Sequence, residues 1–439
     1  MSRGGGFTRD VAGIFLNQAF LLGAGILTGV LTARGLGPDG RGLYAIALLF
    51  PSFLSSMLPL GLNFANLYLV NREGAPPGRL AFNTIAYSAS SGLLFTLGLV
   101  MFSASLSASF AGGEGRGLIA LAAAALIPSM LFENVYYLLL GRRDIKGMTA
   151  MNLARAAAYA ALLGGMFIFP GFTPGKAVMA YLGGLGAGLI LGFARLKKNG
   201  FLSDFRPSRT HFGAALGYGI RQHPSSVLQF LTYRTDLFIV GAFLPASEAG
   251  LYAAAVVIAE LLWQLPAAAA QVLFPKVAAS SEKESGEFTP QVVRHVLLIS
   301  GVSAAGLFLA AGYAVTLLYG TEFSGAALPL RILLPGAVLM GLSKMLGSDI
   351  AARGRPGTVS MASAASFITA AWLGIALTPL FGLPGAALAT SAAYAVNSAV
   401  MTLSFLRISG KKAADIFVFK KEDLSVYRGL KSRIFPGLR

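Results

Sequence analysis

The amino-acid sequence predicts an all-α polytopic membrane protein, with about twelve transmembrane helices in two pseudo-symmetric six-helix lobes around a central cavity. Of its 439 residues, 55% are hydrophobic and only 12% are charged. Its apolar residues fall in runs of about 20, the length that crosses a bilayer as a helix. The sequence also repeats itself, because 36–48 reads LGPDGRGLYAIAL and 244–256 reads LPASEAGLYAAAV. A membrane chain built twice from one unit is the layout of a transporter whose site lies between the halves.

The apolar runs define the expected helices in chain order. Prolines inside the runs predict kinks, which membrane helices tolerate when neighbours satisfy the freed backbone groups. These prolines are Pro51, Pro59, Pro128, Pro224, Pro266 and Pro335. The expected helices cover roughly 11–33, 42–70, 80–106, 117–140, 148–170, 176–194, 212–240, 250–275, 292–319, 326–351, 357–380 and 384–406.

A polar, basic segment at 195–211 separates the two copies of the repeat. We therefore expect an N-lobe at 1–205, a C-lobe at 206–409 and a basic cytoplasmic tail at 410–439. Each copy starts and ends on the same side of the membrane, so an axis along the membrane normal should relate them. The tail interleaves basic and apolar residues, which is typical of a segment on the inner membrane surface.

The distribution of charge predicts the orientation of the chain. Of the 35 Lys and Arg residues, 26 fall in the termini and the connections on one side, and 4 fall on the other side. This asymmetry places both termini in the cytoplasm. The net charge of +17 is explained in this way, without a nucleic-acid partner. The apolar run after the basic start is too long for a cleavable signal, and the chain has no cysteine for disulfide or thiol chemistry.

The repeated segments also resemble a known family. In 233–278, Asp236 precedes an apolar stretch that ends at Gly241, then come a short acidic turn, Gly-Leu-Tyr at 250–252 and Pro275. This order resembles the seventh and eighth helices of Wzx-type oligosaccharide flippases, in the multidrug/oligosaccharidyl-lipid/polysaccharide export superfamily. The segment ARGLGPDGRGLYAIALLFP at 33–51 is similar to the equivalent part of the first repeat.

The resemblance implies transport of undecaprenyl-diphosphate-linked oligosaccharide from the inner to the outer leaflet of the bacterial cytoplasmic membrane. It implies alternating access coupled to an ion gradient, with membrane lipids around the chain. It also implies a polysaccharide polymerase and a chain-length regulator as partners. The identity of the glycan, the coupling ion (proton or sodium) and the oligomeric state stay open.

Cations inside the predicted spans are candidates for binding the diphosphate. A charged residue at the centre of a span costs ~2.5–3.5 kcal/mol on insertion scales, so it tends to face a cavity or a partner. A guanidinium is always charged and can bind two phosphate oxygens at once. Arg221, Arg234, Lys344 and Arg331 are the candidates. Arg221 could instead snorkel to the cytoplasmic rim, Arg234 could pair with a carboxylate on another helix, Arg331 could anchor at the outer interface, and Arg155 is expected to be structural.

Three embedded carboxylates, Glu133, Asp236 and Glu260, are candidates for ion coupling. A carboxylate in a medium of low dielectric can hold a proton near neutral pH, so it could exchange that proton for substrate. Gln264, a candidate for substrate binding, follows Glu260 by four residues, which would place both on one helix face. Hydrogen bonding between helices is the alternative role for Glu260 and Gln264.

Other polar and aromatic residues could bind sugar. The apolar faces of sugar rings could stack on Trp263, which could equally be a packing residue. Several unranked polar residues could bind sugar hydroxyls, and they are equally suited to join helices. They are Asn17, Gln18, Asn63 and Asn66 in the first two expected helices, and Asn134, Tyr136 and Tyr137 in the fourth. A pH-sensing role for His223 is possible on its residue type alone.

The sequence contains no catalytic motif, no metal-ligand set and no phosphate-binding loop, so we expect neither an enzyme nor a cofactor. The main alternative function is a cation-coupled multidrug or metabolite exporter of the same superfamily. The excess of cations over acids within the spans argues against a cavity for organic cations. A lipid II flippase is a third possibility. The resemblance to that branch is weaker, because its members usually have two more helices than the twelve expected here.

Overall fold

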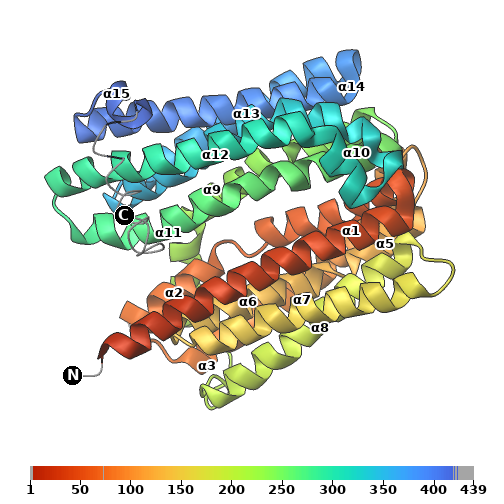
Figure 1. Cartoon of the computed structure of the whole chain (residues 1–439). Helices are drawn as coiled ribbons and strands as arrows, with labels where there is room; N and C mark the ends of the chain where they lie inside the picture. The colour runs from red at the N-terminus through yellow and green to blue at the C-terminus, as the bar shows by residue number, and fades with distance from the viewer. Residues whose placement is uncertain (1–2, 73, 419, 421–422, 424–439) are drawn as a thin grey trace. The chain divides into compact units, whose positions relative to one another are not determined.

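The chain folds almost entirely as helices (Figure 1). The structure, a computed structural model, describes residues 3–72, 74–418, 420 and 423, except for the side chains of 3–19, 71–72, 222 and 282–283. Within those residues there are α-helices and two short 3₁₀ segments, and no strand. This confirms the predicted all-α class. The helices form two compact units, Met1–Ala254 with Val315–Gly325 and Ala255–Ala314 with Ala326–Arg439.

The first unit contains the N-terminal helices, and α6, α7 and α8 pack beside α1 within it. Figure 1 shows these four helices running alongside one another. The helices are α1 (Arg3–Met57), α2 (Leu62–Arg72), α3 (Pro77–Met101), α4 (Ser103–Phe110), α5 (Arg116–Ala123), α6 (Leu126–Gly141), α7 (Ile145–Ile168), α8 (Pro174–Lys198), α9 (Arg209–Phe243) and most of α10 (Ala246–Glu260).

In the second unit α13 packs closely against α14 and α11. Its core joins residues of α11, α12, α13 and α14, among them Leu273, Val296, Met345 and Phe405. The elements are η1 (Leu261–Trp263), α11 (Gln264–Ala279), most of α12 (Glu282–Tyr319), α13 (Ala327–Ala352), α14 (Pro356–Ser409) and α15 (Ala413–Phe417). The segment η2 (Thr321–Ala326), which connects α12 to α13, belongs to the first unit except for Ala326.

Nine helical segments in the described residues are long and apolar enough to cross a membrane. The chain is therefore a multi-pass membrane protein. The segment Pro356–Ser409 has 54 residues, which would extend about 81 Å as one straight helix, against a hydrocarbon core of about 30 Å. Gly382, with φ 61° and ψ −141°, divides it into two helices. The count of twelve spans stays a prediction, since α9 is not among these nine segments.

Two of the expected loops are single-residue turns. Gly37, with φ 66° and ψ −179°, divides α1 as Gly382 divides α14. Both glycines adopt a positive φ that other residues rarely reach. Pro38 follows Gly37 at once and Pro384 follows Gly382 after one residue, and proline fits the first turn of a new helix. The loops expected at 34–41 and 381–383 are therefore tight helix-to-helix turns.

Three of the six prolines that predict kinks lie at interruptions of the helices. Pro59 lies in the turn between α1 and α2, Pro128 follows the break between α5 and α6, and Pro266 follows the 3₁₀ turn η1. The other three, Pro51, Pro224 and Pro335, lie inside continuous α-helices.

The two repeated segments meet at a reciprocal glycine contact inside the first unit. A Cβ added to Gly42 would lie 1.6 Å from the carbonyl oxygen of Ala246, and one added to Gly250 would lie 2.0 Å from that of Pro38. Pro38 precedes Gly42 by four residues, as Ala246 precedes Gly250. Residue and partner thus exchange roles across the contact, as expected for two related segments that face each other about a two-fold axis.

Glycines also bring α8 close to α7. A Cβ on Gly184 would lie 2.8 Å from the carbonyl oxygen of Arg155, and one on Gly188 would lie 3.1 Å from Cβ of Arg155. Small residues allow this approach, as is common between membrane helices. The first turn of α7 is fixed separately by Asp144, whose carboxylate accepts from the backbone N–H of Gly147 at 2.9 Å.

The start of the predicted tail packs on the second unit. Ile416 of α15 is fully buried and belongs to the core of that unit. The expectation that the apolar tail residues lie on the membrane surface is therefore wrong for Ile416. Packing in the protein's own core removes this apolar side chain from water. Most of the tail, at 424–439, lies outside the described residues.

Candidate functional site

The first unit contains a polar pocket of about 280 Å³. Its walls come from the end of α1, the turn before α2, the start of α2, and the helices α6 and α9. We call it the Glu133 pocket. Its lining residues are Ser56, Pro59, Gly61, Asn63, Phe64, Glu133, Tyr137, His223, Ser226, Gln229, Phe230 and Tyr233.

The turn before α2 sets the position of this wall. Leu60 and Gly61 both have positive φ, at 48° and 73°. A Cβ on Gly61 would lie 2.2 Å from the carbonyl oxygen of Gly219, so only glycine lets α2 begin this close to α9. The turn therefore brings Asn63 and Phe64, the second and third residues of α2, against α9.

A hydrogen-bonded pair forms the polar centre of the pocket. Asn63 Nδ2 donates to Glu133 Oε1 at 3.0 Å. The backbone N–H of Phe64 donates to Asn63 Oδ1 at 3.0 Å, which fixes the orientation of the amide. No described residue donates to Glu133 Oε2, so this oxygen can accept a bond from a ligand. Phe64 and Tyr137 make an edge-to-face contact, with ring centroids 5.1 Å apart.

One face of α9 supplies the opposite wall. His223, Ser226, Phe230 and Tyr233 follow one another at spacings of three and four residues, so they share a helix face. The pocket thus combines a carboxylate, amides, hydroxyls and aromatic rings inside an apolar helical unit. These groups can donate to, accept from and stack on a polyhydroxylated ligand such as a sugar.

Of the predicted site residues in the first unit, the structure places Glu133 in this pocket. Arg221 is exposed. Arg234 is half-buried beside the pocket residue Tyr233, and its Nη1 donates to the Tyr233 carbonyl oxygen at 3.3 Å. Asp236 is buried and accepts from the hydroxyl of Tyr252 at 3.0 Å.

The candidate Gln18 lies on α1, and its side chain is outside the described residues. Tyr252 belongs to the second copy of the Gly-Leu-Tyr repeat, so this repeat helps to hold Asp236 on α9.

The second unit brings Lys344 and Trp263 together. Lys344 Nζ lies 4.7 Å from the centroid of the Trp263 ring, and Tyr394 contacts the same ring edge-to-face at 5.6 Å. Trp263 is buried. Arg331 lies elsewhere, where its Nε donates to the Phe308 carbonyl oxygen at 3.1 Å.

Glu260 and Gln264 are not joined by a continuous α-helix. Glu260 ends α10, Gln264 begins α11, and the 3₁₀ turn η1 lies between them. The α-helix whose face they were expected to share is therefore interrupted, because a 3₁₀ turn has about 3.0 residues per turn. Gln264 is exposed.

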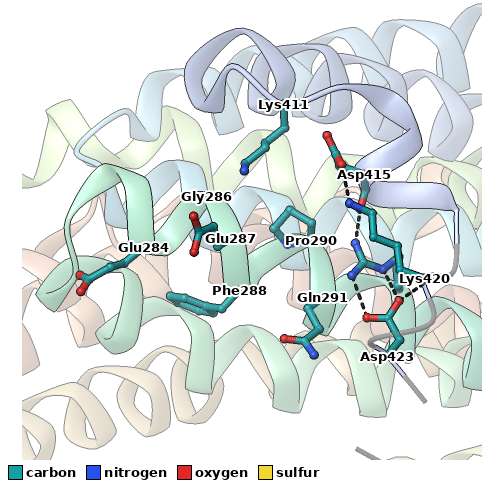
Figure 2. Close-up of a pocket in the computed structure, with 11 residues that line it drawn as sticks. Glu284, Gly286, Glu287, Phe288, Pro290, Gln291, Lys411, Asp415, Lys420 and Asp423 are labelled. Carbon is teal, nitrogen blue, oxygen red and sulfur yellow. Dashed lines mark hydrogen bonds and ion pairs between the residues drawn. The ribbon is translucent and has the colours of Figure 1, made fainter. Parts of the chain in front are cut away.

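A larger cavity, of about 520 Å³, lies in the second unit between α12 and the chain after α14. Figure 2 shows Asp415, Lys420 and Asp423 gathered on one side of it. Arg294 donates from Nε and Nη2 to the two carboxylate oxygens of Asp423, each at 2.7 Å, and from Nη1 to the Asp415 carbonyl oxygen. These bonds hold the pKa of the Asp423 carboxyl below its usual value. Because Arg294 bonds both Asp415 and Asp423, we explain this side of the cavity as the place where the start of the tail packs on α12.

Sequence reasoning did not single out Ser226, Gln229, Phe230 or Tyr233. A signal for them was present, because polar residues recur on α9 at helical spacing within an otherwise apolar run. Asn63 and Tyr137 were considered without being ranked, since the sequence does not show which helices α2 and α6 contact.

Comparison with known proteins agrees with this architecture. Among curated proteins, a probable low-salt glycan biosynthesis flippase of Haloferax volcanii is 23% identical over 391 residues, 88% of this chain and 80% of that protein. The succinoglycan biosynthesis transport protein ExoT of Rhizobium meliloti is 24% identical over 335 residues. That match covers 73% of this chain and 64% of ExoT, less than two thirds of its length.

Two solved structures share the fold. The lipid II flippase MurJ in an inward closed conformation has a TM-score of 0.75 at 16% identity, covering 98% of this chain and 99% of that one. An inward-facing multidrug resistance transporter of the MATE family, in the MOP superfamily, has a TM-score of 0.73 at 18% identity, covering 89% and 95%. The family model described as polysaccharide biosynthesis protein matches residues 31–328, more than half of the chain. The chain therefore belongs to the polysaccharide biosynthesis protein family.

Proposed function

We propose that this protein is a flippase that moves undecaprenyl-diphosphate-linked oligosaccharide from the inner to the outer leaflet of a bacterial cytoplasmic membrane. The observation that carries the proposal is the Glu133 pocket, which places sugar-binding chemistry inside a membrane helical unit. Family membership, the glycan flippase among the relatives and the fold shared with MurJ support it.

In this proposal the Glu133 pocket binds hydroxyl groups of the glycan. Glu133 Oε2 accepts from a hydroxyl, and the rings of Phe64 and Tyr137 pack on the apolar face of a sugar. Arg221 and Arg234 on α9 and Lys344 on α13 remain candidates for the diphosphate. Glu133, Asp236 and Glu260 remain candidates for ion coupling.

Transport would proceed by alternating access of the two repeats, 1–205 and 206–409. Both termini would lie in the cytoplasm, as the distribution of Lys and Arg predicts. A polysaccharide polymerase and a chain-length regulator are the proposed partners. We propose transport alone, with no catalytic step.

A cation-coupled exporter is the second candidate function, and the fold shared with the multidrug resistance transporter favours it. In an exporter the same carboxylate, Glu133, would bind a cation or an organic amine. The two functions predict different phenotypes, because only the exporter should change the drug susceptibility of a host that lacks its own exporters.

The experiment is to deplete the protein from its cells and measure on which membrane face the lipid-linked oligosaccharide lies. Accumulation on the cytoplasmic face, reversed by re-expression of the wild type, is the expected result. The N63L variant should restore export poorly, because leucine cannot orient Glu133. The variant N66L is the matched control, since Asn66 is a buried amide of the same helix that bonds Thr84 and does not line the pocket. Normal export after depletion, with no second flippase present, would contradict the proposal.

A further inference from the structure

Arg155 on α7 is a guanidinium without a partner in the described part of the chain. It is the eleventh residue of Ile145–Ile168, about 15 Å along the helix and so near the middle of a membrane span. Its Nε is buried and has no hydrogen-bond partner. No described residue forms an ion pair with it. A guanidinium has five N–H donors and cannot lose its charge, so this position is costly unless a ligand supplies acceptors.

The surroundings of Arg155 form a second pocket in the first unit, of about 230 Å³. We call it the Arg155 pocket. None of its described lining residues is acidic, so the guanidinium is the only full charge among them. The lining residues are Leu21, Ala24, Gly25, Thr28, Arg155, Ala156, Tyr159 and Tyr181.

Packing holds Arg155 in this position. Its guanidinium carbon lies 5.0 Å from the centroid of the Phe132 ring. A Cβ on Gly188 would lie 2.6 Å from that Phe132 ring and 3.1 Å from the Arg155 Cβ, so α8 closes the space behind both side chains. Tyr159 and Tyr181, which also line the pocket, meet edge-to-face at 5.7 Å. The site is thus formed before any ligand binds.

Other arginines of the same unit have the partners that Arg155 lacks. Arg34 donates to the carbonyl oxygens of Leu317 and Leu318 at the end of α12. Arg195 pairs with the carboxylate of Asp144. These arginines lie at helix ends, where water also reaches them, whereas Arg155 lies at the depth of the hydrocarbon core. Among these three arginines, the one deepest in its membrane span, Arg155, is therefore the one for which the described residues supply no hydrogen-bond acceptor.

We propose that the Arg155 pocket binds phosphate oxygens of a membrane ligand. A guanidinium can donate two parallel bonds to a phosphate. The hydroxyl of Tyr181, which lines the same pocket, is a further donor. Two sources share this chemistry: the diphosphate of the lipid-linked substrate, and the headgroup of an anionic phospholipid. The first source rests on the proposed function, and the second does not.

The test is equilibrium binding of radiolabelled undecaprenyl diphosphate to the full-length protein in phosphatidylcholine nanodiscs. Wild type is compared with R155Q, with R155K and with the matched control R142Q. Arg142 also lies over an aromatic ring, that of Phe201 at 5.8 Å, but it is exposed and follows the end of α6. We expect R155Q to weaken binding at least ten-fold, R155K to weaken it less, and R142Q to stay within two-fold of wild type.

Competition identifies the source of the phosphate. Unlabelled phosphatidylglycerol, inorganic diphosphate and neutral undecaprenol are the competitors. Strong competition by inorganic diphosphate, but weak competition by phosphatidylglycerol and undecaprenol, supports the substrate diphosphate. Radiolabelled phosphatidylglycerol is measured directly in the same nanodiscs as well. Phosphatidylglycerol binding that depends on Arg155 supports a phosphate site filled by membrane lipid, even if undecaprenyl diphosphate does not bind and the proposed function fails.

Two results would overturn the proposal. One is binding of every phosphate probe by R155Q within two-fold of wild type. The other is a lower melting temperature of R155Q without ligand, restored in R155K, because a purely structural cation would behave in that way. We expect instead that R155Q melts no lower than wild type without ligand, since it removes a partly buried charge that no described acid balances.

Discussion

The reciprocal contact of Gly42 and Gly250 allows a quantitative test of the repeat. In G42A the new Cβ would lie 1.6 Å from the Ala246 carbonyl oxygen, and real contacts are essentially never shorter than 3.0 Å. The two helices must therefore move apart by about 1.4 Å. The obstacle is backbone and cannot rotate away, so the cost should lie near the upper end of the usual 1–3 kcal/mol for overpacking. The higher helix propensity of alanine offsets about 1 kcal/mol, which leaves about 2 kcal/mol of destabilisation.

The assay is thermal unfolding of the purified protein in detergent, with G164A as the matched control. Gly164 lies inside α7, and a Cβ there would meet nothing within 4 Å. At roughly 2–4 °C per kcal/mol, G42A should melt about 4–8 °C below wild type. G164A should melt at or above wild type. The double variant G42A/G250A should lose less than the sum of the single losses, because one separation relieves both clashes. A G42A variant as stable as G164A would refute the reasoning.

Three further predictions follow from the polar contacts. In E133Q the bond from Asn63 can persist while the charge is lost, so glycan binding should remain within about three-fold while transport in proteoliposomes loses its dependence on an ion gradient; unchanged gradient dependence would exclude Glu133 as the coupling group. Interactions with Arg195 lower the Asp144 pKa to about 2 from 3.8, so Asp144 should stabilise the fold above pH 4 and lose this contribution as the pH falls toward 2. The D144N variant should lower the free energy of unfolding by about 1–2 kcal/mol at pH 7 and by less at pH 3. The lower end of that range applies because Arg195 is partly exposed, which weakens the ion pair. An equal loss at both pH values would contradict this. In D423N the buried Arg294 loses its carboxylate, so about 3 kcal/mol should be lost and limited proteolysis should cut the tail faster; cleavage at the wild-type rate would show that the pair does not hold it.

Much of the fold was predictable because membrane helices obey simple rules. Apolar runs located the helices, and prolines such as Pro59 and Pro266 marked interruptions. The turns at Gly37 and Gly382 were expected as loops, because hydropathy does not reveal a one-residue change of direction. Pro266 predicted a kink, but the sequence did not show that Leu261–Trp263 before it form a 3₁₀ turn, since these residues are as apolar as their neighbours.

The candidate sites were only partly predictable. Glu133 was identified because an acid in an apolar run is rare. Its partner Asn63 could not be chosen, since that choice depends on how α2 and α6 pack. Arg155 was expected to be structural, because the sequence does not show how the helices around it pack. Its lack of partners depends on α1, α7 and α8 together, and no single segment shows it.

The exchange of roles between Gly42 and Gly250 also has an evolutionary consequence. A contact in which each segment offers its glycine to the other's carbonyl is the contact that two identical chains make in a homodimer. An ancestor with one copy of the unit could have formed it by self-association, with one glycine serving both sides. After duplication and fusion the two glycines became separate positions, and each still faces the backbone of the other copy. The backbone of each copy leaves no space for a side chain at the glycine of the other. The Gly-Leu-Tyr repeat should therefore persist where the surrounding sequence has diverged.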